Sequence, residues 1–454
     1  MGFDNGRGTG DFGNIRRVAM ISVHTSPIAT LGAKDAGGMN VYVRELSRQL
    51  GRQGVAVDIF TRRSDTLTPD IVEPFENVRV VTITAGPPAT VPKEALFGYL
   101  GEFASEMALF GLRDGVSYDV IHAHYWLSGM TALLLRRYWT APIVQMFHTL
   151  AALKKEAAKG AADGQEPVLR IESERQLISR VDAIVAGNAR ERAEMTWWYG
   201  LCTSKIQTIP CGIDLERFYP QDRAAARAEL GFGAAPTLLF VGRIDPVKGI
   251  DFLIEGYAGL RAGWSGVEAP QLVIVGGELL DSKDGNKDGS KGDGKDGELG
   301  IDLARVRDLA AKYGVADGLI FRGPQSHERL ARYYAATDLT VVPSRYESFG
   351  LVAIESMACG TPVVASRAGG LAYTVEDGRN GLLVPYGDAP ALTAALDRAL
   401  RDDTLRRKMG FGAFATAQEY SWADVATRVL ALYRETNAAR HTALASLPAI
   451  AAGD

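Results

Sequence analysis

Cysteine is scarce in this chain of 454 residues, where only Cys202, Cys211 and Cys359 occur. Their number is odd, they are widely spaced, and no two form a CxxC pair. The sequence therefore offers neither a disulfide framework nor a structural zinc site. This cysteine usage is typical of a reducing compartment, and we expect a cytoplasmic location.

Long apolar runs and an excess of positive charge are also missing. No stretch approaches the ~18 consecutive apolar residues of a membrane-spanning helix, so we expect no membrane span. The formal net charge is −4, which gives no overall basic field to attract nucleic acid. The expected partners are small-molecule substrates, and a homodimer is left open.

The chain does have enough apolar residues for two folded domains. Hydrophobic residues make up 46% of the sequence and charged residues 23%, the composition of a globular protein. Single cores stop growing near ~250–300 residues. A chain of 454 residues therefore predicts two domains.

Short apolar runs, separated by helical patterns such as residues 42–53, predict two series of buried strands. The expected strands cover residues 17–23, 55–61 and 119–122, and then 237–242, 271–276, 319–321, 339–343 and 362–365. Alternating strands and helices favour a parallel sheet covered on both faces. The predicted fold class is therefore α/β, with two Rossmann-like, doubly wound domains facing each other across a cleft.

Pro210 and Gly212 lie between the two series of strands. Because Pro and Gly interrupt regular secondary structure, they predict the domain boundary there. The expected parts are a disordered leader over 1–14, one domain over 15–211, a second over 212–418, a helix over 419–437 that returns to the first domain, and a disordered tail over 438–454.

Residues 281–298 consist almost wholly of Gly, Asp and Lys, and we expect a disordered surface insertion there. Asp284, Asn286 and Asp288 imitate the start of a calcium-binding loop. Lys295 stands at the twelfth position, where such a loop needs a bidentate Glu. The segment therefore disfavours calcium.

Two segments predict phosphate sites. The glycine pair that ends at Gly38 precedes the helix expected over 42–53, where free N–H groups and the helix dipole favour an anion. A simple tight turn is the alternative. Arg243 and Lys248 lie five residues apart after a predicted strand and could clamp a diphosphate in place of a metal ion. Two solvated surface cations are the alternative there.

A third segment carries two carboxylates around a predicted helix start. Glu347 lies in a loop and Glu355 on the helix behind it, with seven residues between them. Carboxylates accept hydrogen bonds from sugar and ribose hydroxyls. The helix start at Phe349, Gly350 and Leu351 offers N–H donors to a phosphate. The alternative is a pair of solvated carboxylates flanking a helix.

With these motifs the chain resembles family 4 of the glycosyltransferases, which have the GT-B architecture, over nearly all of residues 16–434. The E-x7-E pattern with an upstream Arg and Lys is the most specific mark. The resemblance implies a retaining hexosyltransferase that takes a UDP-sugar as donor and requires no metal or other cofactor. It implies that the first domain binds the acceptor and the second the nucleotide sugar. The implied donor contacts are Gly38, Arg243 and Lys248 for the diphosphate, Glu355 for the ribose, Glu347 for the sugar, and Phe349, Gly350 and Leu351 at the helix start.

Within the family, the first half is similar to members that glycosylate inositol 3-phosphate. The strings that carry this similarity are HTSP at 24–27, GGMNVYV at 37–43, HYWLSG at 124–129 and HTLAALK at 148–154. The resemblance assigns the acceptor to Asn40 and its phosphate to Lys93, Tyr125, Thr149 and Arg170. Two cations with two hydroxyls suit a dianion. Transfer of N-acetylglucosamine or glucose from UDP to inositol 3-phosphate is expected, and transfer to fructose 6-phosphate is the alternative.

The same resemblance places His148 near the donor sugar, in one catalytic set with Glu347, Arg243 and Lys248. A nucleoside diphosphate is already a good leaving group, so charge stabilisation can replace acid catalysis. We expect the departing phosphate oxygen to take the acceptor proton on the same face of the sugar. The fold also serves nucleotide-sugar epimerases and phosphorylases. A non-catalytic binding module is a further alternative, but it would not need the diphosphate clamp and the sugar contacts together.

Overall fold

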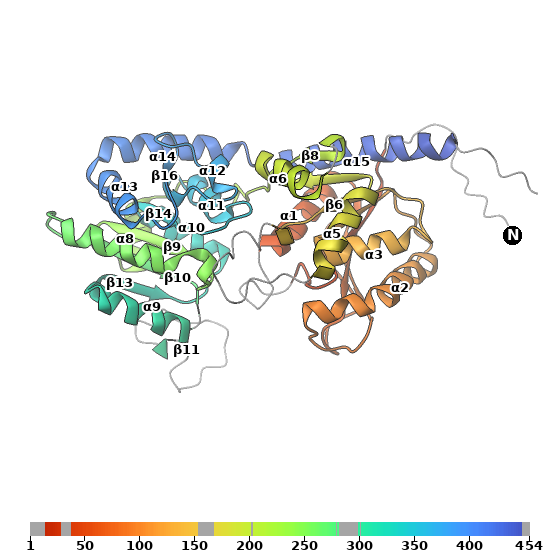
Figure 1. The fold of residues 1–454 in the computed structure, drawn as a ribbon, viewed down its shortest axis with the longest axis horizontal. Helices are drawn as coiled ribbons and strands as arrows, with labels where there is room; N and C mark the ends of the chain where they lie inside the picture. Colours follow the sequence, from red (N-terminus) through yellow and green to blue (C-terminus); the bar gives the residue numbers. More distant parts are fainter. Residues whose placement is uncertain are drawn as a thin grey trace, which may run out of the picture. The chain divides into compact units, whose positions relative to one another are not determined.

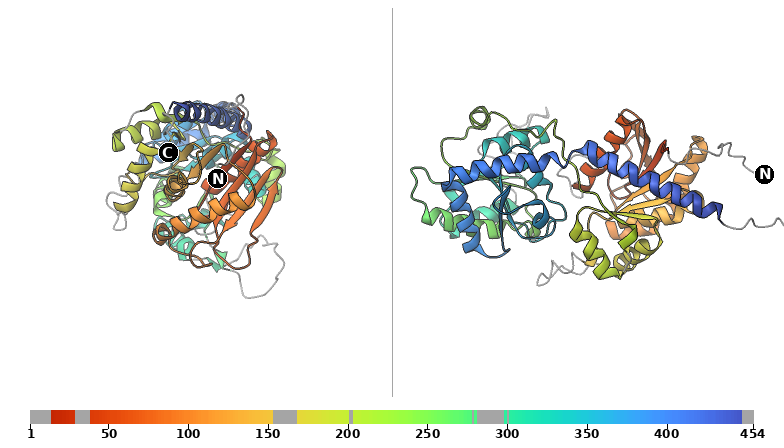
Figure 2. Two further views of the ribbon diagram at one scale, coloured as in Figure 1. Left: turned by 90° about the vertical axis from the view of Figure 1, so that its right-hand side faces the viewer. Right: turned by 90° about the horizontal axis from the view of Figure 1, so that it is seen from above.

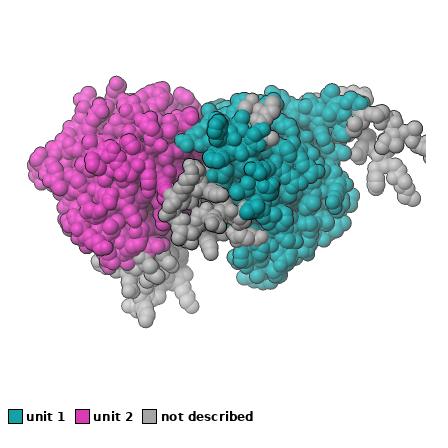
Figure 3. Space-filling model, in the orientation of Figure 1, with its two compact units in different colours: residues 1–210, 422–454 teal, residues 211–421 magenta. Residues whose placement is uncertain are grey.

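The computed structural model describes residues 14–28, 38–152, 168–200, 203–277, 279–280, 298–299 and 301–446. The chain divides into two compact units, which Figure 3 colours separately. Unit 1 comprises residues 1–210 and 422–454, and unit 2 comprises 211–421. The division between Pro210 and Cys211 lies one residue before the boundary expected from the sequence.

Unit 1 is built on an eight-stranded sheet in the order β3-β4-β2-β1-β5-β6-β7-β8 (Figure 1). Neighbouring strands are parallel except for β3 and β4, which are antiparallel. The strands are β1 Arg17–Ile21, β2 Ala56–Arg62, β3 Ile71–Phe75, β4 Val78–Ile83, β5 Val120–His124, β6 Ile143–Met146, β7 Ala183–Ala186 and β8 Ile206–Thr208. The central strands are buried along nearly all their length, which is why they appear in the sequence as continuous apolar runs.

The helices of unit 1 connect these strands. They are α1 Gly38–Arg52, η1 Lys93–Tyr99, α2 Leu100–Arg113, α3 Tyr125–Leu135, α5 Val168–Arg180, α6 Ala189–Tyr199, η2 Thr203–Lys205 and the C-terminal α15 Trp422–Ala445. α1 buries Tyr42, Val43, Leu46 and Leu50, whose spacing of three to four residues gives one apolar face. α15 packs on α1, and Figure 2 shows it lying across unit 1.

Unit 2 has a six-stranded parallel sheet in the order β13-β10-β9-β14-β15-β16. The strands are β9 Thr237–Val241, β10 Gln271–Val275, β13 Leu319–Arg322, β14 Leu339–Val342, β15 Val363–Ser366 and β16 Gly381–Val384, and a separate antiparallel pair is formed by β11 Leu279–Leu280 and β12 Glu298–Leu299. The helices are α7 Arg223–Leu230, η3 Pro246–Lys248, α8 Ile250–Gly263, α9 Ile301–Lys312, η4 Ala316–Gly318, α10 His327–Ala336, α11 Leu351–Ala358, α12 Leu371–Thr374, α13 Ala389–Arg401 and α14 Asp403–Gln418.

Alternate residues of the unit 2 strands enter two different hydrophobic cores. Along β9, Leu238 and Phe240 belong to one core and Leu239 to the other. The same alternation holds along β10, where Val273 and Ile274 belong to different cores. Because side chains alternate across a strand, the sheet has helices packed on both faces, as predicted for a doubly wound domain.

All the strands predicted from the sequence are confirmed to within two residues at either end. The helix predicted over 42–53 begins earlier, at Gly38. Sequence reasoning did not find β3, β4, β6, β7, β8, β11, β12 and β16. Several of these are only three or four residues long, too short to show a period of their own.

The C-terminal helix expected over 419–437 begins later, at Trp422, and continues to Ala445, so the expectation of a disordered tail from residue 438 is wrong for residues 438–445. Alanine is the strongest helix former, and Arg440 approaches Asp182 at 3.9 Å. Residues 1–13 of the expected leader lie outside the described residues. So do residues 281–297 of the expected insertion, whereas Glu298 belongs to β12.

Candidate functional site

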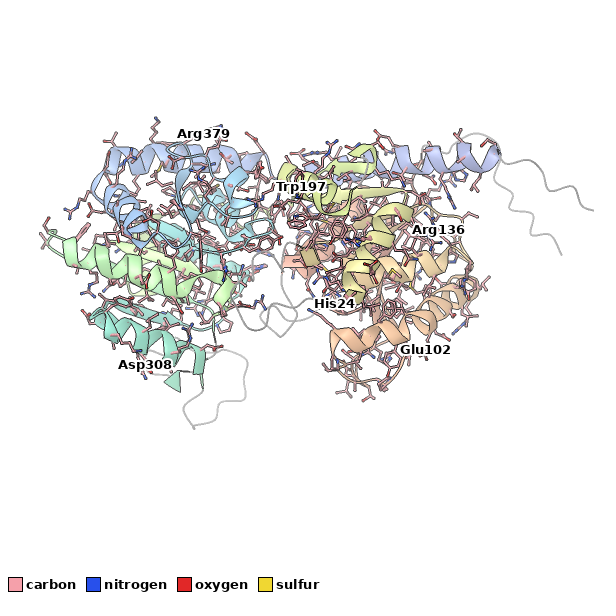
Figure 4. All side chains as sticks on the ribbon, viewed as in Figure 1. His24, Glu102, Arg136, Trp197, Asp308 and Arg379 are labelled. Carbon is pink, nitrogen blue, oxygen red and sulfur yellow. The ribbon has the colours of Figure 1, made fainter. Side chains whose placement is uncertain are left out.

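In both units the predicted site residues follow the carboxyl ends of parallel strands, where ligands bind in open α/β sheets. In unit 1, Tyr125 directly follows β5 and His148 lies two residues after β6. In unit 2, Arg243 lies two residues after β9. Figure 4 labels His24, which follows β1 at the same edge of unit 1. The carboxyl edge of each sheet therefore carries candidate residues.

The first group in unit 2 is an ion pair between two loops. The Lys248 ammonium donates to the Glu347 carboxylate at 2.6 Å, and both side chains are largely buried. The backbone N–H of Arg345 donates to the carbonyl of Val247 at 2.8 Å and holds the loops together. Gly249 lies between them with φ +70°, and a Cβ there would stand 2.0 Å from a backbone oxygen. Only glycine permits this approach.

Arg243 lies on the same loop as Lys248 but is much more exposed. Its side chain is 69% exposed, and its guanidinium lies 3.9 Å from the Asp245 carboxylate. Asp245 itself caps η3 by accepting from the N–H of Val247 at 2.9 Å. The structure thus presents Arg243 as a solvated cation with a loose partner, whereas Lys248 is held in place by Glu347.

The start of α11 is preformed for an acceptor of N–H hydrogen bonds. Gly350 caps this helix with φ +84° and has no side chain to satisfy the first N–H groups. Phe349 and Leu351 on either side are half-buried. The N–H of Gly370 donates to the carbonyl of Glu347 at 2.7 Å, which fixes the backbone just before the helix.

The second carboxylate of the E-x7-E pattern has a different environment from the first. Glu355 is 7% exposed and accepts from the Tyr334 hydroxyl at 2.7 Å. Burial raises the pKa of Glu355 to about 7, against the opposing effects of the Tyr334 hydrogen bond and the Arg217 charge. Glu355 can therefore titrate near neutral pH.

In unit 1 the structure brings together the four residues that the sequence analysis assigns to the acceptor phosphate. They come from η1, the start of α3, the loop after β6, and α5. The Lys93 ammonium lies 6.0 Å from the centre of the Tyr125 ring, and the Arg170 guanidinium lies 5.0 Å from it. Arg170 also donates to the Thr149 hydroxyl at 3.1 Å and to its carbonyl at 2.8 Å. Two cations thus lie over the Tyr125 ring, and Thr149 joins the group through Arg170.

These four residues are not equally accessible. Lys93, Tyr125 and Thr149 are half-buried, whereas Arg170 is only 3% exposed. The Nε of Arg170 donates to Glu174 at 2.8 Å, one helical turn further along α5. Arg170 therefore lies behind the other three. Sequence reasoning missed Glu174, and the only signal for it is the i,i+4 spacing from Arg170.

Tyr125 and His148 both have left-handed backbones, with φ +74° and +61°. Positive φ is uncommon for residues other than glycine and costs about 1–3 kcal/mol. Such strain persists only where the surrounding structure enforces it. Its presence at the two strand ends that carry the acceptor residues and His148 supports a functional interpretation of this edge.

The buried His122 and His124 form a cluster with the half-buried His148 beside the acceptor residues. His148 Nε2 lies 3.0 Å from His124 Nδ1, and the ring of His122 lies 4.2 Å from that of His124. The Tyr433 hydroxyl of α15 bonds His122 Nδ1 at 2.6 Å. Burial lowers the pKa of His148 to about 3; burial together with the neighbouring His148 lowers that of His122 to about 3. His124 is shifted in the same direction, so all three rings are neutral at pH 7.

Gly38 and Asn40 open α1. Gly38 is exposed at the first helical position, which leaves its backbone accessible, while the two residues before it lie outside the described part of the chain. Asn40 is 1% exposed, and its amide donates to the Thr25 hydroxyl at 2.7 Å and to the Ser26 carbonyl at 2.6 Å. These contacts give Asn40 a role in holding the loop after β1; its assignment to the acceptor stays a prediction.

Two general findings concern the described residues as a whole. No three His, Cys, Asp or Glu side chains within the described ranges are arranged to hold a metal ion. None of the helices in these ranges combines the length and the apolar character that crossing a bilayer requires.

Comparison with known families gives two consecutive matches. The family described as Glycosyltransferase Family 4 matches residues 36–217, and that described as Glycosyl transferases group 1 matches residues 222–415. Among curated relatives, a D-inositol 3-phosphate glycosyltransferase from Nocardioides sp. is 42% identical, over 93% of this chain and 91% of the relative. The protein of that name from Nocardia farcinica is 41% identical, over 92% and 89%.

Solved structures show the same fold. Sucrose-phosphate synthase from Thermosynechococcus elongatus has a TM-score of 0.81 and 36% identity, over 93% of this chain and all of that one. Anabaena HepE, in complex with UDP and glucose, has a TM-score of 0.66 at 18% identity, over 95% of this chain and all of that one. At that identity the second likeness concerns the fold alone.

Proposed function

The chain belongs to glycosyltransferase family 4, has the GT-B type of fold, and is a glycosyltransferase; on that premise we propose that it transfers a sugar from a UDP-sugar to inositol 3-phosphate with retention of configuration. N-acetylglucosamine and glucose are the proposed sugars. The proposed compartment is the cytoplasm. The curated relatives named D-inositol 3-phosphate glycosyltransferase support this acceptor.

The observation that carries the proposal is the convergence of four residues in unit 1. Lys93, Tyr125, Thr149 and Arg170 are separated by 20 or more residues along the chain, yet contacts through the Tyr125 ring and the Arg170 guanidinium link all four. Charge-assisted hydrogen bonds to a phosphate contribute about 1.5–3 kcal/mol each. An acceptor that carries a phosphate therefore suits this place better than a neutral sugar does.

Unit 2 would hold the donor. We assign the diphosphate to Arg243, Lys248 and the N–H groups at the start of α11. Glu347 would accept from hydroxyls of the sugar and Glu355 from those of the ribose. Support comes from the Lys248–Glu347 ion pair, which brings the side chains proposed for the diphosphate and for the sugar into contact. Gly38 of unit 1 is assigned to the phosphates as well, because its helix start is exposed.

In the proposed reaction, the bond from the anomeric carbon to the diphosphate oxygen breaks as the acceptor hydroxyl oxygen bonds to the same carbon on the same face. The hydroxyl proton passes to the departing phosphate oxygen, so the atoms balance without a covalent enzyme intermediate. Arg243 and Lys248 stabilise the charge that develops on the diphosphate. His148, neutral because of its burial, contacts the donor sugar as a hydrogen-bonding group.

Transfer to fructose 6-phosphate is the second candidate, because a sucrose-phosphate synthase shares 36% identity and the fold. A phosphate pocket alone does not separate the two acceptors. The decisive experiment incubates the protein with UDP-, GDP- and ADP-sugars and with inositol 3-phosphate, fructose 6-phosphate or unphosphorylated inositol. Mass spectrometry then identifies the product.

We expect a glycosylated inositol phosphate from a UDP-sugar. A sucrose phosphate would establish the second candidate, and an epimerised donor without transfer would contradict both. Retention is read from the anomeric coupling of the product in its proton NMR spectrum.

A further inference from the structure

We propose that Glu174 is a positioning residue, which holds Arg170 and the loop of His148 and Thr149 in one arrangement and thereby sets the affinity for the acceptor phosphate. This inference rests on the proposed function for its link to the acceptor. The holding of the loop stands on the geometry alone.

The Glu174 carboxylate is completely buried and fully engaged. One oxygen accepts from Arg170 Nε at 2.8 Å, and the backbone N–H of Ala151 approaches both oxygens at 3.2 and 3.0 Å. The second oxygen also accepts from the Tyr199 hydroxyl of α6. Three segments therefore converge on one carboxylate: α5, α6 and the loop after β6.

The hydrogen bond from the Ala151 N–H to Glu174 matters because Ala151 closely follows two candidate site residues. His148 and Thr149 lie three and two residues before Ala151 on the same loop, and His148 has a left-handed backbone. A strained backbone needs fixed neighbours to persist. Glu174 supplies such an anchor just beyond the strained residue.

The hydrogen bond between Glu174 and Arg170 fixes the position of the Arg170 guanidinium among the residues assigned to the acceptor phosphate. With its Nε held by Glu174, the guanidinium can donate through its outer nitrogen to Thr149 and lie over the Tyr125 ring. Burial raises the pKa of Glu174, and the Arg170 charge, the Tyr199 hydroxyl and the Ala151 N–H oppose that rise. A buried arginine also needs a partner for its charge.

Two physical effects of Glu174 on a phosphate have opposite signs. As a nearby negative charge it would weaken phosphate binding, so its removal alone would tighten binding. As an anchor for Arg170 and Thr149 it strengthens binding, so its removal would weaken it. The direction of the change in a charge-neutral variant therefore separates positioning from simple charge compensation.

The test is Glu174→Gln, which keeps the shape of the side chain. The KM for inositol 3-phosphate should rise about 10- to 100-fold, the equivalent of one lost charge-assisted contact, while the KM for the UDP-sugar stays within about twofold. Tyr199→Phe, which removes one of the bonds to the carboxylate, should shift the acceptor KM in the same direction by a smaller factor. Tyr199→Phe also keeps the proposal testable if Glu174→Gln does not fold.

Unit 1 offers a matched control at the opposite edge of its sheet. Asp58 is likewise fully buried, accepts from Arg17 and Arg79 at 2.7–2.9 Å, and accepts from the Tyr118 hydroxyl at 2.8 Å. Asp58→Asn and Tyr118→Phe remove the same chemistry near the amino ends of the strands. They should lower the melting temperature and leave the acceptor KM unchanged.

A second readout does not depend on the acceptor. Hydrogen exchange at the Ala151 amide should be at least tenfold faster in Glu174→Gln than in the parent protein, and unchanged in Asp58→Asn. An unchanged or lowered acceptor KM in an active Glu174→Gln variant would overturn the inference. If the parent protein transfers to none of the acceptors, the proposed function fails; accelerated exchange at Ala151 then still supports the anchor, and unaltered exchange refutes it.

Discussion

Lys248 and Glu347, which stand 99 residues apart in the sequence, form a 2.6 Å ion pair between the loops after β9 and β14. A bound nucleotide sugar would place its diphosphate beside Lys248 and its sugar hydroxyls beside Glu347. The pair compensates both charges when no donor is bound, so a bound diphosphate would have to share Lys248 with Glu347. The two residues should therefore be coupled in their effects on binding and on turnover.

Glu347→Gln should separate these two effects. UDP alone should bind as tightly as before or more tightly, because Lys248 no longer faces a carboxylate. Turnover should fall about 10²-fold through loss of the sugar contact. Calorimetry with UDP and a steady-state assay with the UDP-sugar measure the two quantities.

The control for Glu347→Gln is Asp251→Asn, which breaks an exposed ion pair with Arg305 in the same unit and should change neither quantity. Weaker UDP binding by Glu347→Gln would contradict the idea that Glu347 and the diphosphate compete for Lys248.

Arg243→Ala tests the exposed half of the clamp. Among the described residues its guanidinium forms only a loose ion pair, 3.9 Å from the Asp245 carboxylate, so truncation should perturb the fold little. Loss of a cation that meets the developing charge should reduce kcat by about 10²-fold or more. Arg305→Ala on α9 removes another exposed arginine of unit 2 and should leave kcat within about twofold. A drop of only a few-fold in Arg243→Ala would remove this residue from the catalytic set.

The sequence predicted the fold best for strands that are buried on both faces of the sheet. The first strand, at residues 17–21, is apolar after Arg17 because both faces of the sheet are covered; the sequence predicts its start and places its end two residues too late, at Val23. By contrast, β8 has three residues and only one is buried, so nothing in its pattern distinguishes a strand. The antiparallel β3 depends on its pairing with β4, a tertiary contact.

The candidate site shows the same division. The family resemblance named Lys93, Tyr125, Thr149 and Arg170 as one group, and the structure brings them together. Glu174 lies in a run of charged residues on α5 that would suit an exposed helix face, yet it is completely buried. Its role depends on contacts from α6 and the loop after β6, and such tertiary contacts cannot be predicted from the local sequence.

Glu355 predicts a pH dependence of donor binding. Burial raises its pKa from the ordinary 4.5 to about 7, so the carboxyl is mostly protonated at pH 6. The ionised carboxylate accepts from ribose hydroxyls through both oxygens and more strongly than the protonated carboxyl, in which one oxygen has become a donor. Affinity for a UDP-sugar should therefore rise with pH, by at most about tenfold per unit below pH 7, and level off above pH 7.

Calorimetry across pH 5.5–8.5 measures this profile, and the diphosphate of a UDP-sugar stays ionised throughout that range. Glu355→Gln should give weak binding without the slope, whereas Glu347→Gln should keep the slope. A profile that stays flat in the parent protein would exclude titration of Glu355 on donor binding.

Lys93 should govern discrimination in favour of a phosphorylated acceptor. Lys93→Met removes the ammonium, which lies 6.0 Å from the centre of the Tyr125 ring, and keeps much of the apolar stem. The KM for inositol 3-phosphate should rise about 10- to 100-fold, and any slow transfer to unphosphorylated inositol should be unaffected. Arg113→Met, on the exposed end of α2, is the control. Equal losses with both acceptors would mean that Lys93 does not meet the phosphate.

The His124–His148 pair leads to a prediction about a single proton. Both rings are neutral because burial lowers the pKa of each, so one N–H is shared across the 3.0 Å contact between His124 Nδ1 and His148 Nε2. Among the described residues, no group bonds the buried Nε2 of His124. In a protein interior, an N–H group without a hydrogen-bond acceptor is less tolerated than a nitrogen lone pair without a donor. His124 should therefore carry its proton on Nδ1 and donate it to His148, which leaves His148 with its own proton on Nδ1.

Nitrogen-15 spectra of imidazole-labelled protein should show the Nδ1–H form for both rings from pH 5 to 8. His124→Phe should shift His148 toward the Nε2–H form and lower kcat about tenfold, since a donor at the wrong nitrogen cannot make the same sugar contact. An Nε2–H signal for His148 in the parent protein would reverse the direction of the hydrogen bond and remove this role from His124.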